Sequence, residues 1–177
     1  MDASDIARKI LLQVRSKLVV RRQELQKVFE NPGDIQFLDL ESSPTLWAEI
    51  ATNGLSWPYP RHSHFKVHIE DNYDEVVSIL AEFLSDISEL EAFCFSEQWR
   101  QTGGFIASPA TVASCLPKLM WVSNDWLNIF TPDLKRALLI DGDRTGTWDR
   151  LNDLQIYIYG EPWAKNLIVR GLDVRKY

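Results

Sequence analysis

Cysteine and long apolar segments are scarce in this chain of 177 residues. Cys94 and Cys115 are its only cysteines, which excludes a framework of several disulfides and favours a reducing compartment. The longest uncharged stretch, from Gln101 to Pro117, is interrupted by glycine, serine and proline, so no membrane-spanning segment is predicted. The N-terminal residues MDASDIARKILLQV lack the uncharged apolar core of a secretion signal. We therefore expect a cytoplasmic protein with no membrane partner.

Recognisable catalytic motifs are also lacking. No glycine-rich segment has the spacing of a phosphate-binding loop. Serine and aspartate are plentiful, but no spacing pairs a nucleophile with a general base. The sequence therefore predicts a protein that is not an enzyme and that carries no cofactor.

Histidine is limited to one short segment, RHSHFKVH, which contains His62, His64 and His68. On an extended strand all three would share one face, because their positions have the same parity, and the His-x-His pair has a spacing that suits zinc. His68, however, would lie about 13 Å from His64 along the strand, too far for one ion without a bend. We therefore predict no metal site. A small metal-dependent enzyme using these histidines, with Asp141 or Asp143 nearby, is the alternative function.

The overall composition is that of an ordinary globular domain, with 45% hydrophobic and 25% charged residues. The length suits one domain with a substantial core, and no internal repeat or linker is present. In some segments apolar residues recur about every 3.6 positions, as in helices, and in others at every second position, as in strands. We predict a single α+β domain over residues 1–177, in which a mostly antiparallel sheet packs against a few amphipathic helices.

The expected elements follow from these periods and from the turn residues. A basic amphipathic helix is expected over residues 4–30, an α+β body over 35–160 and a C-terminal tail with a short helix over 161–177. Alternation within the body predicts strands at 35–40, 65–69, 91–96, 126–130, 136–141 and 154–159. Ser43-Pro44 and Ser108-Pro109 are each expected to cap and begin a helix. The strands at 126–130 and 136–141 are expected to form a β-hairpin.

The expected N-terminal helix is rich in basic residues. Seven of them outnumber four acidic residues over the first 30 positions, and they are Arg8, Lys9, Arg15, Lys17, Arg21, Arg22 and Lys27. Such a helix can bind nucleic acid, but a solvated helix face is the simpler interpretation. Because the net charge of the chain is −6, contact with a phosphate backbone is disfavoured. We expect no nucleic-acid partner.

The most unusual stretch is the acidic segment from Val67 to Gln98. Neither lysine nor arginine occurs between Lys66 and Arg100, whereas nine carboxylates do. A concentration of one charge creates a field that attracts cationic partners. We predict that eight of these residues form a partner-binding surface: Glu70, Asp71, Asp74, Glu75, Glu82, Asp86, Glu89 and Glu91.

The segment from Trp121 to Asp141, WVSNDWLNIFTPDLKRALLID, joins a tryptophan-containing strand through a turn to a second apolar strand that ends in aspartate. Its Trp126, its Thr131-Pro132-Asp133 turn and its Asp141 resemble a segment of small bacterial immunity proteins of polymorphic-toxin and contact-dependent growth inhibition systems. The resemblance covers about an eighth of the chain and concerns structure, not catalysis. It implies a cytoplasmic protein that binds the C-terminal domain of a cognate toxin.

That toxin domain is expected to be a basic protein, often a nuclease, which the immunity protein neutralises by covering its active site. An acidic face suits this function because complementary charge speeds association. The seven tryptophans of the chain suit it as well, since buried aromatic side chains anchor tight interfaces.

Overall fold

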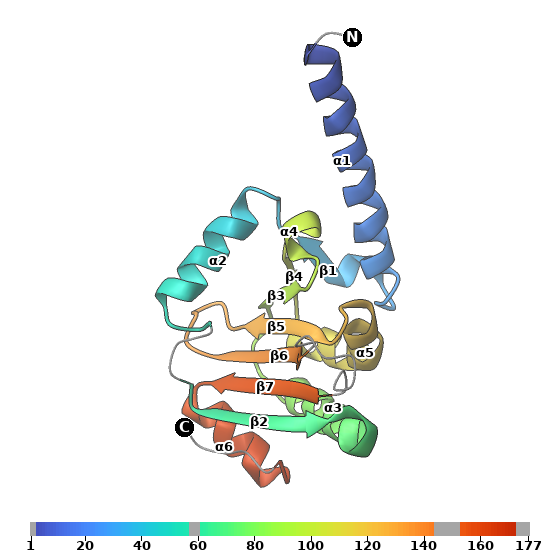
Figure 1. Ribbon diagram of the computed structural model, residues 1–177. Helices are drawn as coiled ribbons and strands as arrows, with labels where there is room; N and C mark the ends of the chain where they lie inside the picture. The colour runs from blue at the N-terminus through green and yellow to red at the C-terminus, as the bar shows by residue number, and fades with distance from the viewer. Residues whose placement is uncertain (1–2, 57–60, 144–152, 173–177) are drawn as a thin grey trace.

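The computed structural model describes residues 3–56, 61–143 and 153–172, and within them all side chains except those of 3–12, 69–71 and 143. Over these ranges the chain forms one seven-stranded sheet with helices on both faces (Figure 1). All pairings between the described strands are antiparallel. The predicted α+β class with a mostly antiparallel sheet is therefore confirmed.

The order of the strands in the sheet differs from their order in the sequence. Across the sheet the strands run β1 (Ile35–Phe37), β4 (Phe105–Ala107), β3 (Ala92–Ser96), β5 (Trp126–Phe130), β6 (Ala137–Asp143), β7 (Asp153–Tyr159) and β2 (Ser63–His68). The predicted hairpin is confirmed as β5 and β6, in which Trp126 lies opposite Asp141 and Phe130 opposite Ala137. The strand that carries the histidines, β2, lies at one edge of the sheet.

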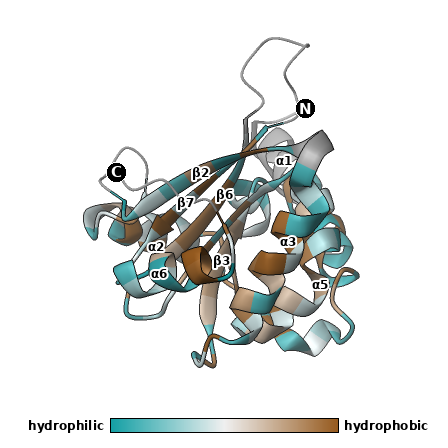
Figure 2. Cartoon of the chain, turned by 90° about the horizontal axis from the view of Figure 1, so that it is seen from below, coloured by the Kyte–Doolittle hydropathy of each residue, from teal (hydrophilic) through white to brown (hydrophobic). Residues whose placement is uncertain are grey.

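The larger core lies between the sheet and the helices α3 (Ile69–Ser85), α5 (Pro109–Val122) and α6 (Glu161–Val169). One side of α3 is buried there, with Leu80, Phe83 and Leu84 at most 2% exposed. Alternate residues of the central strands complete this core, because successive side chains of a strand point to opposite faces. Figure 2 shows α3 divided between hydrophobic and hydrophilic segments, as expected for an amphipathic helix.

A second, smaller core lies on the opposite face of the sheet, under α2 (Ser42–Thr52) and the short helix α4 (Trp99–Thr102). It is mainly aromatic. Trp47 stacks on Trp99 with ring centroids 5.1 Å apart, and it packs edge-on against Phe95 at 5.1 Å and Phe130 at 6.0 Å. Several of the seven tryptophans therefore stabilise the fold itself.

The helix α1 (Ala3–Gln26) projects from the body of the protein (Figure 1). Its last turn and the following residues are anchored, since Leu25 and Phe29 are each 4% exposed. Farther out, Val14 and Val19 are about half exposed. The helix ends at Gln26, before the predicted boundary at residue 30, because residues 28 and 29 form tighter i→i+3 bonds. The short helix η1 (Pro32–Asp34) then leads into β1.

One other expectation about local structure is wrong, one is confirmed, and two short elements were not predicted. Ser43 does not cap α2: the helix begins at Ser42, and the carboxylate of Asp39 accepts hydrogen bonds from the backbone N–H groups of Glu41 (2.9 Å) and Ser42 (2.5 Å). The prediction also missed α4 and β4, which follow β3 closely. Ser108 does cap α5, since its hydroxyl accepts from the N–H of Thr111 at 3.0 Å.

Candidate functional site

Most of the predicted partner-binding residues lie on the outward side of α3 and in the loop that follows it. Asp74, Glu75, Glu82 and Asp86 are exposed, because the opposite side of the same helix is buried in the core. In the loop between α3 and β3, Glu89 is half-buried and Glu91 is exposed. We call these six residues the acidic surface. Glu70 and Asp71 complete the predicted set, and their side chains lie outside the described part of the structure.

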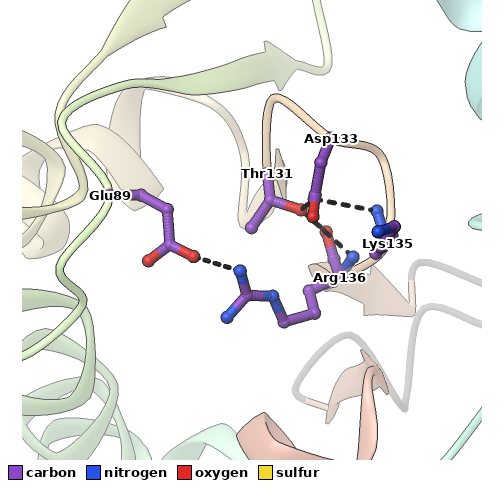
Figure 3. A network of polar contacts seen from close by, with 5 residues as sticks. All are labelled: Glu89, Thr131, Asp133, Lys135 and Arg136. Carbon is purple, nitrogen blue, oxygen red and sulfur yellow. Dashed lines mark hydrogen bonds and ion pairs between the residues drawn. The ribbon is translucent and has the colours of Figure 1, made fainter.

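Half of the acidic surface is engaged by two arginines that are distant in the sequence. Arg170, just beyond α6, forms ion pairs with Asp86 and, at 3.7 Å, with Glu82. Arg136, at the start of β6, forms an ion pair with Glu89 (Figure 3). The acidic segment has no basic neighbour along the chain, yet the fold supplies these two.

The turn that carries Arg136 is fixed by its own hydrogen bonds (Figure 3). The hydroxyl of Thr131 donates to Asp133 at 2.6 Å, and the N–H of Lys135 donates to the same oxygen at 3.2 Å. The hydrogen bond from Thr131 is the main cause that holds the pKa of the Asp133 carboxyl below its usual value. These hydrogen bonds stabilise the turn that places Arg136 beside Glu89.

The other half of the acidic surface keeps its charge uncompensated. Asp74, Glu75 and Glu91 are exposed, and no lysine or arginine of the described residues forms an ion pair with any of them. Leu90, between two acidic residues of the same loop, is 87% exposed. The surface thus combines net negative charge with one protruding apolar side chain, an arrangement that can bind a basic protein.

The N-terminal part of α3 is tied to the sheet by a hydrogen bond. The hydroxyl of Tyr73 donates to the carboxylate of Asp125, just before β5, at 2.9 Å. Burial, followed by the nearby charge of Asp125, raises the pKa of Tyr73, so the phenol keeps its proton and remains a donor. Both ends of the exposed helix face are therefore held in fixed positions.

Two of the three histidines, His64 and His68, lie on β2 and contact different neighbours. His64 stacks on Tyr157 with centroids 4.8 Å apart, and its Nε2 lies 3.2 Å from Oε1 of Gln155. The Nδ1 of His68 lies 2.8 Å from the carboxylate of Asp153, which also binds Lys66 at 2.5 Å. His62 precedes the strand. Among the residues whose positions are described, no three His, Cys, Asp or Glu side chains are grouped so that they could hold a metal ion.

The two cysteines are buried on the α3 side of the sheet. Burial raises the pKa of the Cys115 thiol to about 11 and that of Cys94 further still. Both thiols are therefore protonated at neutral pH, which makes them poor nucleophiles and poor metal ligands.

Two arginines of the basic N-terminal helix form hydrogen bonds with other parts of the chain. The guanidinium of Arg22 donates hydrogen bonds to the backbone carbonyls of Leu38 and Thr102, each at 2.6 Å, and Arg21 donates to Gln101. Burial lowers the pKa of Arg22. These contacts anchor α1 near α4, at the other end of the sheet from α3 (Figure 1).

A scan against protein-family models found no matching family, and a search of curated proteins found no matching relative. Over the described residues, none of the helices combines the length and apolar character needed to cross a membrane.

Proposed function

We propose that this chain is an inhibitory binding protein of the immunity type, which neutralises a basic toxin domain, such as a nuclease, by covering its active site. One observation carries the proposal: Asp74, Glu75 and Glu91 are exposed carboxylates to which the described residues supply no ion-pair partner. The resemblance of the segment from Trp121 to Asp141 supplies the class of protein.

The geometry of the acidic surface supports this function in two ways. The positions from Asp74 to Asp86 span about 18 Å along α3, a length that suits one side of a protein interface. The surface is also preformed, because Tyr73 fixes one end of the helix and Arg170 the other. A preformed surface loses less conformational entropy on binding.

The loop between α3 and β3 adds an apolar contact. Leu90 is 87% exposed, while the ion pair between Glu89 and Arg136 fixes the loop beside it. Burial of an exposed apolar side chain favours association through the hydrophobic effect. We infer that Leu90 inserts into the partner, while the surrounding carboxylates set the orientation of approach.

The first test is affinity capture from a lysate of the source cell with the tagged protein, at low and at high salt. We expect one cationic domain to be retained at low salt and weakened at high salt, because exposed charge pairs are screened. That domain is then expressed in a sensitive host with and without this chain. Growth arrest by the domain alone, relieved by co-expression, supports the proposal. A captured protein that is harmless, or whose toxicity this chain does not relieve, contradicts it.

The position of the binding surface is tested by charge reversal. The triple change Asp74→Lys, Glu75→Lys and Glu91→Lys is expected to weaken binding on the order of 100-fold or more, since like charges across an interface repel. The matched control is a triple reversal that changes the net charge equally at exposed acids outside α3: Glu30→Lys, Glu41→Lys and Glu49→Lys. If both triple variants lose affinity equally, total charge and not the acidic surface governs binding.

A further inference from the structure

A small cavity lies on the face of the sheet opposite α3. Its volume is about 170 Å³, and its walls include side chains of α2 and of three adjacent strands. The residues that matter for its chemistry are Trp47, Trp126, Asn128, Leu139, Asp141 and Tyr157. We call this space the aromatic cavity.

The register of the strands brings these residues together. Asn128 lies opposite Leu139, which in turn lies opposite Tyr157. Two pairs farther along the hairpin, Trp126 lies opposite Asp141. Residues two apart on a strand share a face, so all five point to the same side of the sheet. There α2 adds Trp47, whose ring centroid is 6.0 Å from that of Trp126.

Asn128 is the unusual member of this group. It is 2% exposed, and its side chain forms no hydrogen bond with any described residue. Amide groups inside a protein normally have hydrogen-bond partners, and the space beside Asn128 is the aromatic cavity that it lines. An asparagine between Trp126 and Phe130 on the same strand face is a polar residue in an aromatic environment, and no packing argument requires it there.

We propose that the aromatic cavity binds a guanidinium group. A guanidinium is planar, stacks on aromatic rings and carries only hydrogen-bond donors. The chain itself shows such a contact, since the guanidinium of Arg61 lies 4.5 Å from the centroid of the Tyr157 ring. The rings that remain for a ligand are the indoles of Trp47 and Trp126. Asn128 and Asp141 line the cavity, and an amide oxygen and a carboxylate are both hydrogen-bond acceptors. Asp141 also interacts elsewhere in the chain, but a carboxylate has about four lone-pair sites and can accept a further bond.

The volume of the aromatic cavity restricts the ligand further. An apolar cavity of about 150 Å³ holds a single benzene ring, whereas sites for drug-sized ligands begin at about 300 Å³. The aromatic cavity thus fits a side-chain tip and not a nucleotide. The guanidinium can belong to free arginine or to an arginine on the surface of another protein. Because the aromatic cavity and the acidic surface lie on opposite faces of the sheet, this proposal does not depend on the proposed inhibitory function.

The test is a titration of the ¹⁵N-labelled protein, followed by the indole N–H signals in NMR spectra. The probes are Nα-acetyl-arginine amide, Nα-acetyl-citrulline amide, Nα-acetyl-lysine amide and free L-arginine. We expect saturable shifts of Trp47 and Trp126 with the arginine probes, in the millimolar range, and no shift of Trp121, which is 84% exposed and outside the cavity. Citrulline has the same shape without the charge, so it should bind at least about tenfold more weakly.

Each outcome of this titration has a defined meaning. Tighter binding of the blocked arginine than of the free amino acid supports an arginine of a protein partner as the ligand, and the reverse order supports a small molecule. The proposal is overturned if no probe shifts the two signals, if citrulline binds as well as arginine, or if lysine does.

Two substitutions at one position separate binding from folding. Asn128→Leu removes the acceptor at similar volume, so it should abolish arginine binding while the protein unfolds at an equal or higher urea concentration. Asn128→Asp adds a charge and should tighten arginine binding severalfold. Trp121→Leu is the control and should change neither property. The assignment is wrong if Asn128→Leu binds arginine as well as the unmodified chain does. If Asn128→Leu is unfolded, Asn128→Asp decides: the assignment is then wrong if Asn128→Asp binds arginine no more tightly than the unmodified chain.

Discussion

Arg170 forms an ion pair with Asp86, although the two residues are 84 positions apart in the sequence. The contact joins the end of α6 to the end of α3, and it brings one positive charge into the acidic surface. Arg170 is the less exposed partner, with 22% of its side chain accessible against 64% for Asp86. The pair therefore affects both the stability of the fold and the charge that a partner meets.

Replacing Arg170 should separate these two effects. Arg170→Met keeps much of the apolar stem and removes the charge, so we expect a loss of about 0.2–1 kcal/mol in the free energy of unfolding, as for other exposed ion pairs. Association with a basic partner should become faster at low salt, because the acidic surface gains net negative charge. Urea unfolding and stopped-flow association measure the two quantities. Slower association would show that Arg170 contacts the partner directly.

The carboxylate of Asp39 should make stability depend on pH. The hydrogen bonds from Ser42 and Glu41 lower its pKa in the folded protein, so its contribution is fully present above the unfolded pKa and is lost as pH falls through the folded pKa. Asp39→Asn should therefore be less stable than the unmodified chain at pH 7, and the difference should shrink below about pH 4. Urea midpoints at pH 7, 4 and 2.5 measure it. Glu41→Gln, which alters a side chain that makes no capping bond, should show no such trend.

Gly103 is predicted to be intolerant of any side chain. Its φ of +77° lies in the left-handed region, and an added Cβ would lie 2.5 Å from the carbonyl oxygen of Leu38. Gly103→Ala should cost about 1–3 kcal/mol or more in the free energy of unfolding, from backbone strain and from this clash. Gly33→Ala is the matched control, because nothing lies within 4 Å of its added Cβ. Equal stability of the two variants, measured by urea unfolding, would contradict the conformation described for Gly103.

The aromatic core under α2 should contribute strongly to stability. Trp99 is 7% exposed and stacks on Trp47, so Trp99→Ala should destabilise the protein by about 3–5 kcal/mol. Trp121 is 84% exposed, and Trp121→Ala should change stability by less than about 0.5 kcal/mol. Thermal unfolding followed by circular dichroism distinguishes them. A small effect at Trp99 would mean that α2 and α4 are not stably packed on the sheet.

Elements with strong local signals could be predicted from the sequence. Each of these signals lies within a single short segment of the chain. They are the buried stripe of α3, the alternation of Leu154, Ile156 and Ile158 in β7, and the cap of α5 at Ser108. The elements α4 and β4 were missed because four and three residues are too few to show a period.

Relationships between distant segments could not be predicted. The pairing of β2 with β7 and the approach of Arg136 and Arg170 to the acidic surface depend on the folding of the whole chain. Asn128 had a detectable signal, a polar residue inside an apolar strand. Its position in a cavity became clear only when α2 supplied Trp47 to the same face.

The placement of β2 at the edge of the sheet has a consequence for solubility at high concentration. An edge strand presents unpaired backbone groups to which another molecule can add a strand. In β2, Lys66 and His68 project from the strand and are bound to Asp153 of its neighbour. A lysine on an edge strand discourages edge-to-edge pairing of strands between molecules. The ion pair between Lys66 and Asp153 thus holds a charged group at this edge and hinders growth of the protein into an aggregate.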